Sequence, residues 1–67
     1  MYLYKQEKNK IIDSLASNNR IKMINCLVEL AGDELTTVNE CIKLSKYSKK
    51  QLRLDLVNLY GYFDNLD

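Results

Sequence analysis

The basic residues between positions 43 and 53 are the side chains of this sequence whose types and spacing best fit a chemical role. Five cations fall within eleven residues, and no acidic residue lies among them: Lys43, Lys46, Lys49, Lys50 and Arg53. Lysine and arginine neutralise nucleic-acid phosphates, and arginine also makes bidentate contacts with the O6 and N7 atoms of guanine. The stretch therefore favours a contact with DNA, although a solvated, lysine-rich helix face is the alternative interpretation.

The overall charge balance points the other way. The 67 residues include ten basic and nine acidic side chains, which gives a net charge of +1, whereas nucleic-acid-binding domains are usually basic. The distribution of charge matters more than the sum, because the acids lie outside this stretch and a nearly neutral chain can still present a positive stripe.

Two helix-start signals indicate which elements would position these cations. Thr37 precedes Glu40 by three residues, and Ser48 precedes Gln51 by three residues, which is the spacing of a capping box. Two starts so close leave room for about two turns of helix and a turn of roughly three residues. This is the scale of a helix-turn-helix, whose second helix enters the DNA major groove. We therefore predict a recognition helix over about residues 48–60.

The predicted recognition helix has a polar and an apolar side. Lys49, Lys50 and Arg53 would project toward the groove from its exposed side. Leu52 and Leu56 are four residues apart and would hold the opposite face against the core.

The neighbouring polar residues have supporting roles. Gln51 is expected to complete the capping box, with a contact to adenine as the alternative. Lys43 and Lys46 flank the turn and would contact phosphates, which orient a protein on DNA without reading its sequence. Phosphates would repel Asp55, so we expect it to pair with a nearby lysine or arginine. The complete predicted DNA-binding set is Lys43, Lys46, Ser48, Lys49, Lys50, Gln51 and Arg53.

The remainder of the sequence predicts an all-α fold, because it has no proline, two glycines and no long alternation of polar and apolar residues. The predicted helices cover residues 3–16, a segment that ends before Gly32, residues 38–45 and residues 49–60, with turns at 17–19 and 46–48 and a helix stop at Gly61. The side chains expected to face inward are Ile11, Ile12, Leu15, Ile21, Ile24, Leu27, Val28, Ala31, Leu35, Val38, Cys41, Ile42, Tyr47, Leu52, Leu56, Leu59 and Phe63. We predict one compact domain (1–67) of three to four helices, with an N-terminal helix in 1–18 and a helix-turn-helix core in 19–63.

The string TTVNECIKLSKYSKKQLRLDLVNL, residues 36–59, resembles the N-terminal helix-turn-helix of Mga-type and DeoR-type bacterial transcription regulators. The shared features are a serine that opens the recognition helix, here Ser48, and a Leu-Arg-x-Asp-Leu core, here residues 52–56. Residues 20–27 also resemble the helix that precedes the motif in Mga-like proteins, so the resemblance covers residues 19–63. It implies a DNA-binding transcription regulator with a winged-helix-like fold.

Three residues depart from the family pattern. Ile42 stands where a small residue usually lets the two helices approach, Ser45 replaces a leucine, and Leu54 replaces a polar or basic residue that would face DNA. The resemblance also implies a β-hairpin wing after Gly61, whereas this sequence ends at Asp67. If the resemblance holds, the wing is therefore truncated or absent. The chain would then be an excised domain or a small protein that ends early.

A protein-interaction module is the main alternative, for instance a small phage or plasmid protein that binds a host regulator or polymerase without contacting DNA. Tyrosine is enriched in binding patches. The candidate contact residues are apolar side chains left over once the core is satisfied: Tyr2, Tyr4, Leu54, Tyr60 and Tyr62.

Other classes of function are not expected. The sequence has no histidine, no glycine-rich phosphate loop, no convincing carboxylate pair and no metal-ligand cluster. We therefore expect no catalysis, no cofactor and no small-molecule substrate.

Cys26 and Cys41 lie on predicted apolar faces, which favours free thiols in a reducing cytosol over a structural disulfide. No apolar run approaches the roughly 20 residues that span a bilayer, and the polar N-terminus is unlike a signal peptide. We therefore expect a cytoplasmic protein whose partner is double-stranded DNA; a homodimer, or attachment to the remainder of a larger regulator, is compatible with this function.

Overall fold

Four helices make up the part of the chain that the structure describes: α1 (Lys5–Ser17), α2 (Arg20–Ala31), α3 (Thr37–Ser45) and α4 (Lys49–Leu66). The computed structural model describes residues 4–31 and 37–66, except for the side chains of residues 31, 37, 38 and 40. No strand occurs within these ranges. The predicted all-α class is therefore confirmed for them.

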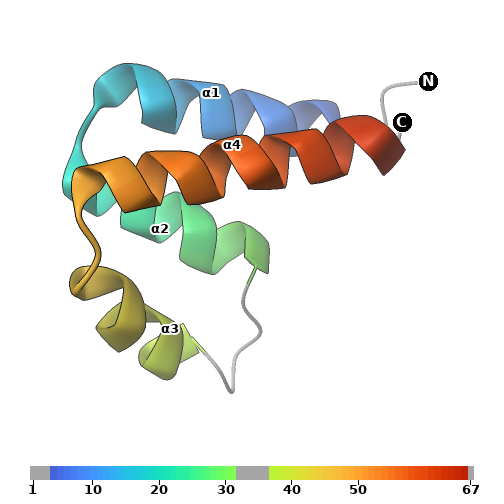
Figure 1. Ribbon diagram of the computed structural model, residues 1–67. Coiled ribbons are helices and arrows are strands. Elements are labelled where there is room, and N and C mark those ends of the chain that lie inside the picture. Colours follow the sequence, from blue (N-terminus) through green and yellow to red (C-terminus); the bar gives the residue numbers. More distant parts are fainter. Residues whose placement is uncertain (1–3, 32–36, 67) are drawn as a thin grey trace.

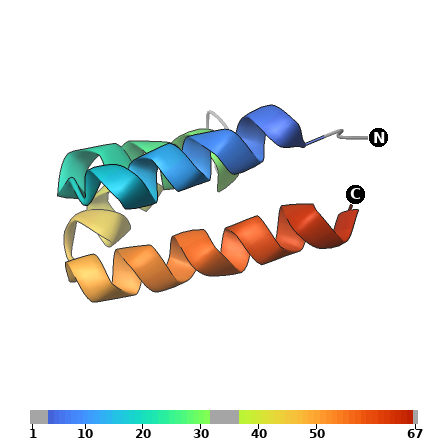
Figure 2. The same cartoon turned by 90° about the horizontal axis from the view of Figure 1, so that it is seen from above.

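The two longest helices, α1 and α4, pack side by side and run in opposite directions (Figures 1 and 2). α2 packs against both of them, and α3 packs mainly against α2. The start of α1 and the end of α4 lie at one end of the molecule, whereas the connection from α3 to α4 lies at the other (Figure 1).

Local polar chemistry determines the break between α1 and α2. Asn18 adopts a left-handed conformation with φ of 48°, which asparagine tolerates better than most residues, and its N–H donates to the carbonyl of Leu15 at 3.2 Å. The side-chain oxygen of Asn19 then accepts hydrogen bonds from the N–H groups of Ile21 and Lys22, at 3.0 and 3.1 Å. Asn19 therefore caps α2, and the turn predicted at residues 17–19 is confirmed.

The core lies where α1, α2 and α4 meet. Its fully buried side chains come from all three helices and are Ile11, Met23, Leu52 and Leu56. Leu44 brings α3 into the same cluster, and Tyr47 packs against it from the turn, as predicted. The apolar spine of α4 is also confirmed, since Phe63 is buried and Leu59 packs against the cluster.

Three isoleucines that the sequence predicts to face inward are exposed instead: Ile12, Ile21 and Ile42. Consecutive helical residues point about 100° apart, and with Ile11 directed into the core, Ile12 lies on an open flank of α1. For the same reason Ile42 points outward beside the half-buried Cys41. Ile21 is 69% exposed, on a flank of α2 turned away from the core. Met23 and Leu44, which the sequence did not single out, are buried in their place.

α4 continues through Gly61 to Leu66, so the predicted helix stop at Gly61 is wrong. The added turns place Phe63 in the core, with its ring centroid 5.1 Å from that of Tyr4. Burial of a phenylalanine side chain stabilises by about 1.5–3 kcal/mol, which exceeds the roughly 1 kcal/mol that glycine costs inside a helix. Tertiary packing therefore outweighs the local preference for a helix end.

Some predictions fall on backbone or side chains outside the described ones: those for Tyr2, Ala31, Gly32, Leu35, Val38 and the Thr37–Glu40 capping box. Cys26 is buried, Cys41 is half-buried, and both are free thiols, as predicted. Among the described helices, none is both long and apolar enough to cross a bilayer.

Candidate nucleic-acid interface

A short turn over residues 46–48 joins α3 to α4, at the position that the sequence predicts. The N–H of Tyr47 donates to the carbonyl of Leu44 at 3.0 Å and closes the end of α3. Ser48 then caps α4, because its Oγ accepts a hydrogen bond from the N–H of Gln51 at 3.2 Å. The start of α4 is therefore fixed by a side chain that the sequence identified.

The second half of the predicted capping box is absent from the described contacts. Nε2 of Gln51 donates to Oδ1 of Asp55 at 2.9 Å, one turn further along α4, rather than back to Ser48. Asp55 is thus paired with an amide and not with the lysine or arginine that was predicted. Ser48 therefore caps α4 without help from Gln51, whose side chain donates its hydrogen bond to the carboxylate of Asp55 instead.

All of the predicted DNA-binding side chains are exposed: Lys43, Lys46, Ser48, Lys49, Lys50, Gln51 and Arg53. The four lysines of this set make no ion pair with any residue that the structure describes. Their charges are therefore not neutralised within this part of the molecule.

Arg53 differs from these lysines. Its Nη1 donates to the carbonyl of Leu15 at 2.8 Å and to Oδ1 of Asn18 at 3.4 Å. Both acceptors lie at the C-terminal end of α1, where unpaired carbonyls and the helix dipole favour a cation. Arg53 therefore ties α4 to the end of α1, and its guanidinium is engaged within the domain.

The structure brings only part of the predicted set together. One shallow hollow at the start of α4 is lined by Asn18, Lys49, Lys50, Arg53, Leu54 and Val57. Lys43 and Lys46 belong to α3 and the turn and do not line it. Leu54 and Val57 are 49% and 55% exposed, so apolar surface lies directly beside the cations.

Arg20 is a positioning residue that the sequence analysis missed. Its guanidinium donates to the main-chain carbonyls of Ser45 and Tyr47, at the end of α3 and in the turn. A cation in the first turn of a helix is unfavourable for the dipole of that helix, so an arginine at the start of α2 was a signal for a contact elsewhere. This contact holds the turn, and with it Lys46, against α2.

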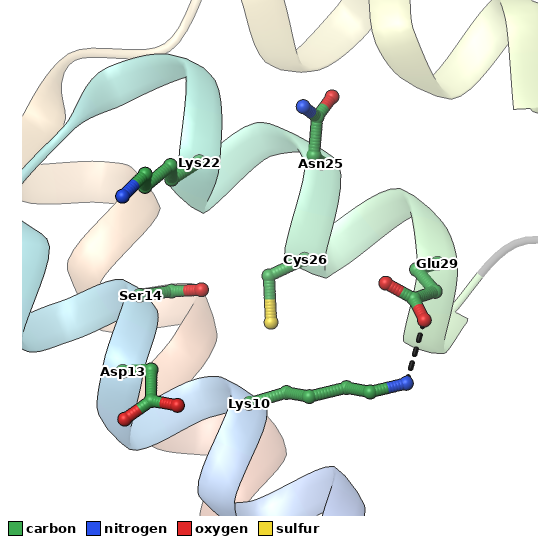
Figure 3. Close-up of a pocket in the computed structure, with 7 residues that line it drawn as sticks. All are labelled: Lys10, Asp13, Ser14, Lys22, Asn25, Cys26 and Glu29. Carbon is green, nitrogen blue, oxygen red and sulfur yellow. Dashed lines mark hydrogen bonds and ion pairs between the residues drawn. The ribbon is translucent and has the colours of Figure 1, made fainter.

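A second hollow, between α1 and α2, contains the polar side chains drawn in Figure 3. Nζ of Lys10 lies 2.6 Å from Oε1 of Glu29, and the hydrogen bond and charge of Glu29 raise the pKa of Lys10. Burial raises the pKa of the Cys26 thiol, against the opposing effect of a hydrogen bond with Ser14. Both groups stay protonated at neutral pH, which is the opposite of the activation that a nucleophile needs.

The tyrosines of the alternative interaction surface do not form one exposed group. Tyr4 and Tyr60 pack against the core, whereas Tyr62 is exposed. Among the members of that predicted set that the structure describes, Leu54 alone lies in the hollow beside the cations, together with Val57, which the sequence did not single out.

No protein-family model matches the chain, and neither a curated protein nor a solved structure resembles it significantly.

Proposed function

We propose that this chain is the DNA-binding helix-turn-helix module of a bacterial or phage transcription regulator. In this proposal α3, the turn and α4 form the motif, and α4 lies in the major groove. One observation carries it: the capped start of α4 is surrounded by exposed lysines that have no ion-pair partner among the described residues. These lysines are Lys43, Lys46, Lys49 and Lys50.

The lysines would divide the contacts by their positions. Lys49 and Lys50 are the first residues of α4, and the N-terminal residues of a recognition helix meet base edges and the phosphates beside them. Lys43 lies in the last turn of α3 and Lys46 in the connection, so both would contact phosphates. Cytoplasmic localisation follows from this proposal, since the DNA of bacteria lies in the cytoplasm.

The residues beside the lysines would support them. Ser48 fixes the start of α4 through its cap. Gln51 donates one N–H of Nε2 to Asp55, which leaves its Oε1 and its second N–H for a contact with adenine. Arg53 would act mainly by positioning α4 against α1, in contrast to the guanine contact that was expected of it. Leu54 adds a methyl surface that could meet the methyl group of thymine.

Titration of isotope-labelled protein with a duplex of about 20 base pairs tests the proposal. We expect changes in backbone amide shifts centred on residues 43–51, and we expect them to fade steeply between low and moderate salt, because binding to phosphates releases counterions. Replacing Lys49 and Lys50 together by alanine should reduce the slope of log affinity against log salt by roughly two.

A charge-matched control variant distinguishes a defined DNA-binding site from general electrostatic attraction between the protein and DNA. Lys5→Ala with Lys22→Ala removes the same charge from exposed positions elsewhere on the domain, and it should leave the salt slope close to that of the wild type. Equal losses in the two double variants would contradict a defined interface at α4. The absence of amide shifts at low salt, from folded protein, would refute DNA binding by this chain.

A further inference from the structure

Three shallow hollows follow one another along the seam between α1 and α4. The hollow at the start of α4 shares Val57 with the next one. That one shares Ile12 and Tyr60 with the third, which extends to Lys5 at the start of α1. The hollows therefore form one continuous depression along most of α1, and we name it the α1–α4 furrow.

The floor of the α1–α4 furrow is apolar and open to solvent. Ile12 and Val57 lie at its centre, and they are 47% and 55% exposed. Leu54 extends this surface into the hollow at the start of α4. Single exposed apolar residues are ordinary, but a contiguous row of them marks a binding surface.

The charged side chains that line the furrow in the described part of the chain are all basic. Lys5 and Lys8 lie at one end, and the other end holds Lys49, Lys50 and Arg53. At the rim of the furrow, Oδ1 of Asp64 lies 3.5 Å from Nζ of Lys8. The furrow thus combines an apolar floor with two cationic ends.

These charges distinguish between the candidate occupants. Two copies of this chain packed furrow to furrow would place cations against cations, which disfavours a dimer through this face. A phosphate backbone would satisfy the cations but would leave the apolar floor exposed. An amphipathic helix with acidic residues beside its apolar stripe satisfies both features, and a helix laid in an apolar groove is a common mode of recognition.

We propose that the α1–α4 furrow binds an acidic amphipathic helix of another protein. α1 has 13 residues and is about 20 Å long at 1.5 Å per residue, so a partner helix of nearly four turns fits along it. Its apolar stripe would cover Ile12 and Val57, and its carboxylates would reach Lys5 at one end and Lys49 and Lys50 at the other. The last two lysines also belong to the proposed DNA contact, so the peptide and DNA would compete.

Fluorescence anisotropy with two labelled synthetic peptides of about 16 residues tests this. The first has leucine at i, i+3, i+4 and i+7 spacing and glutamate at most other positions, and the second has lysine in place of each glutamate. We expect the acidic peptide to bind at least about tenfold more tightly. Replacing Ile12 and Val57 together by glutamine should weaken that binding at least about tenfold, because the apolar contact is lost.

The matched control replaces Ile21 and Ile42 by glutamine. These isoleucines are also exposed and lie outside the furrow, so the control should keep wild-type affinity, with circular dichroism showing that both variants are folded. Failure of both peptides to bind, or equal losses in the two variants, would overturn the proposal.

Two further results would assign the furrow to another occupant. Self-association in the ultracentrifuge that only the Ile12 and Val57 variant abolishes would make a second copy the occupant. Tighter binding to phosphatidylserine vesicles than to the acidic peptide would indicate a membrane surface. A variant with Lys43 and Lys46 replaced by alanine keeps this proposal separate from DNA binding, because these residues lie outside the furrow: it should weaken DNA binding and leave peptide binding unchanged.

Discussion

Replacing Arg20 by alanine should destabilise the whole domain, although the residue is only half-buried. Its guanidinium donates to the carbonyls of Ser45 and Tyr47, and this contact joins α2 to the end of α3 and to the turn before α4. The substitution leaves those carbonyls without their donor. The end of α3 and the turn before α4 would then lose these two polar contacts with α2.

The size of the effect follows from two opposing contributions. Hydrogen bonds from a charged group contribute about 1.5–3 kcal/mol, and we take about 2 kcal/mol for the pair because one of the two bonds is exposed. Removing a cation from the first turn of α2 relieves an unfavourable dipole interaction of about 0.5 kcal/mol. The net loss is about 1.5 kcal/mol, which corresponds to a fall in Tm of about 6–12 °C for a domain of this size.

Thermal unfolding followed by circular dichroism measures this loss. Lys22→Ala is the matched control, because it removes a cation from the exposed side of the same helix and should change stability by less than about 0.5 kcal/mol. Arg20→Lys should fall between the two, since an ammonium cannot reproduce the fork of donors that bridges both carbonyls. A Tm for Arg20→Ala within about 2 °C of that for Lys22→Ala would refute the reasoning.

Three other substitutions or reactions test the packing. Gly61→Ala should stabilise the domain by about 0.5–1 kcal/mol, because a Cβ added at Gly61 meets nothing within 4 Å; a lower Tm would contradict the continuous α4. Leu56→Ala should lower the free energy of unfolding in urea by about 2–5 kcal/mol, since Leu56 is fully buried. Leu54→Ala should lower it far less, and similar losses would mean that the buried face of α4 is misassigned. N-ethylmaleimide should modify Cys41 well before Cys26, because Cys26 is buried and its pKa is raised; equal rates by mass spectrometry under native conditions would contradict that burial.

The parts of the structure that depend on local chemistry were predictable from the sequence. Asn19 and Ser48 are caps because their side chains reach N–H groups two or three residues ahead, and such contacts need no knowledge of the rest of the fold. The same holds for the spine of α4, since side chains four residues apart share one helix face whatever that face meets.

The parts that depend on neighbouring helices were not predictable. α2 carries apolar residues around much of its circumference, so periodicity could not distinguish the exposed Ile21 from the buried Met23. Nothing near Gly61 in the sequence shows that Phe63 meets Tyr4, the residue that precedes α1. The roles of the arginines were hidden for the same reason, because the carbonyl that Arg53 reaches is 38 residues away in the chain.

The pairing of α1 with α4 has a consequence for how the chain folds as it is synthesised. Lys8 meets Asp64 across 56 residues of sequence, and Ile11 shares a core with Leu52 and Leu56. On the ribosome, which adds residues from the N-terminus, α1 can pack against α2 early, whereas the part of its apolar side that meets α4 stays open until α4 has emerged. Long-range closure of this kind slows folding in comparison with helical bundles that are built from local contacts. Until α4 has emerged, the nascent chain therefore exposes the faces of α1 and α2 that α4 covers in the folded domain.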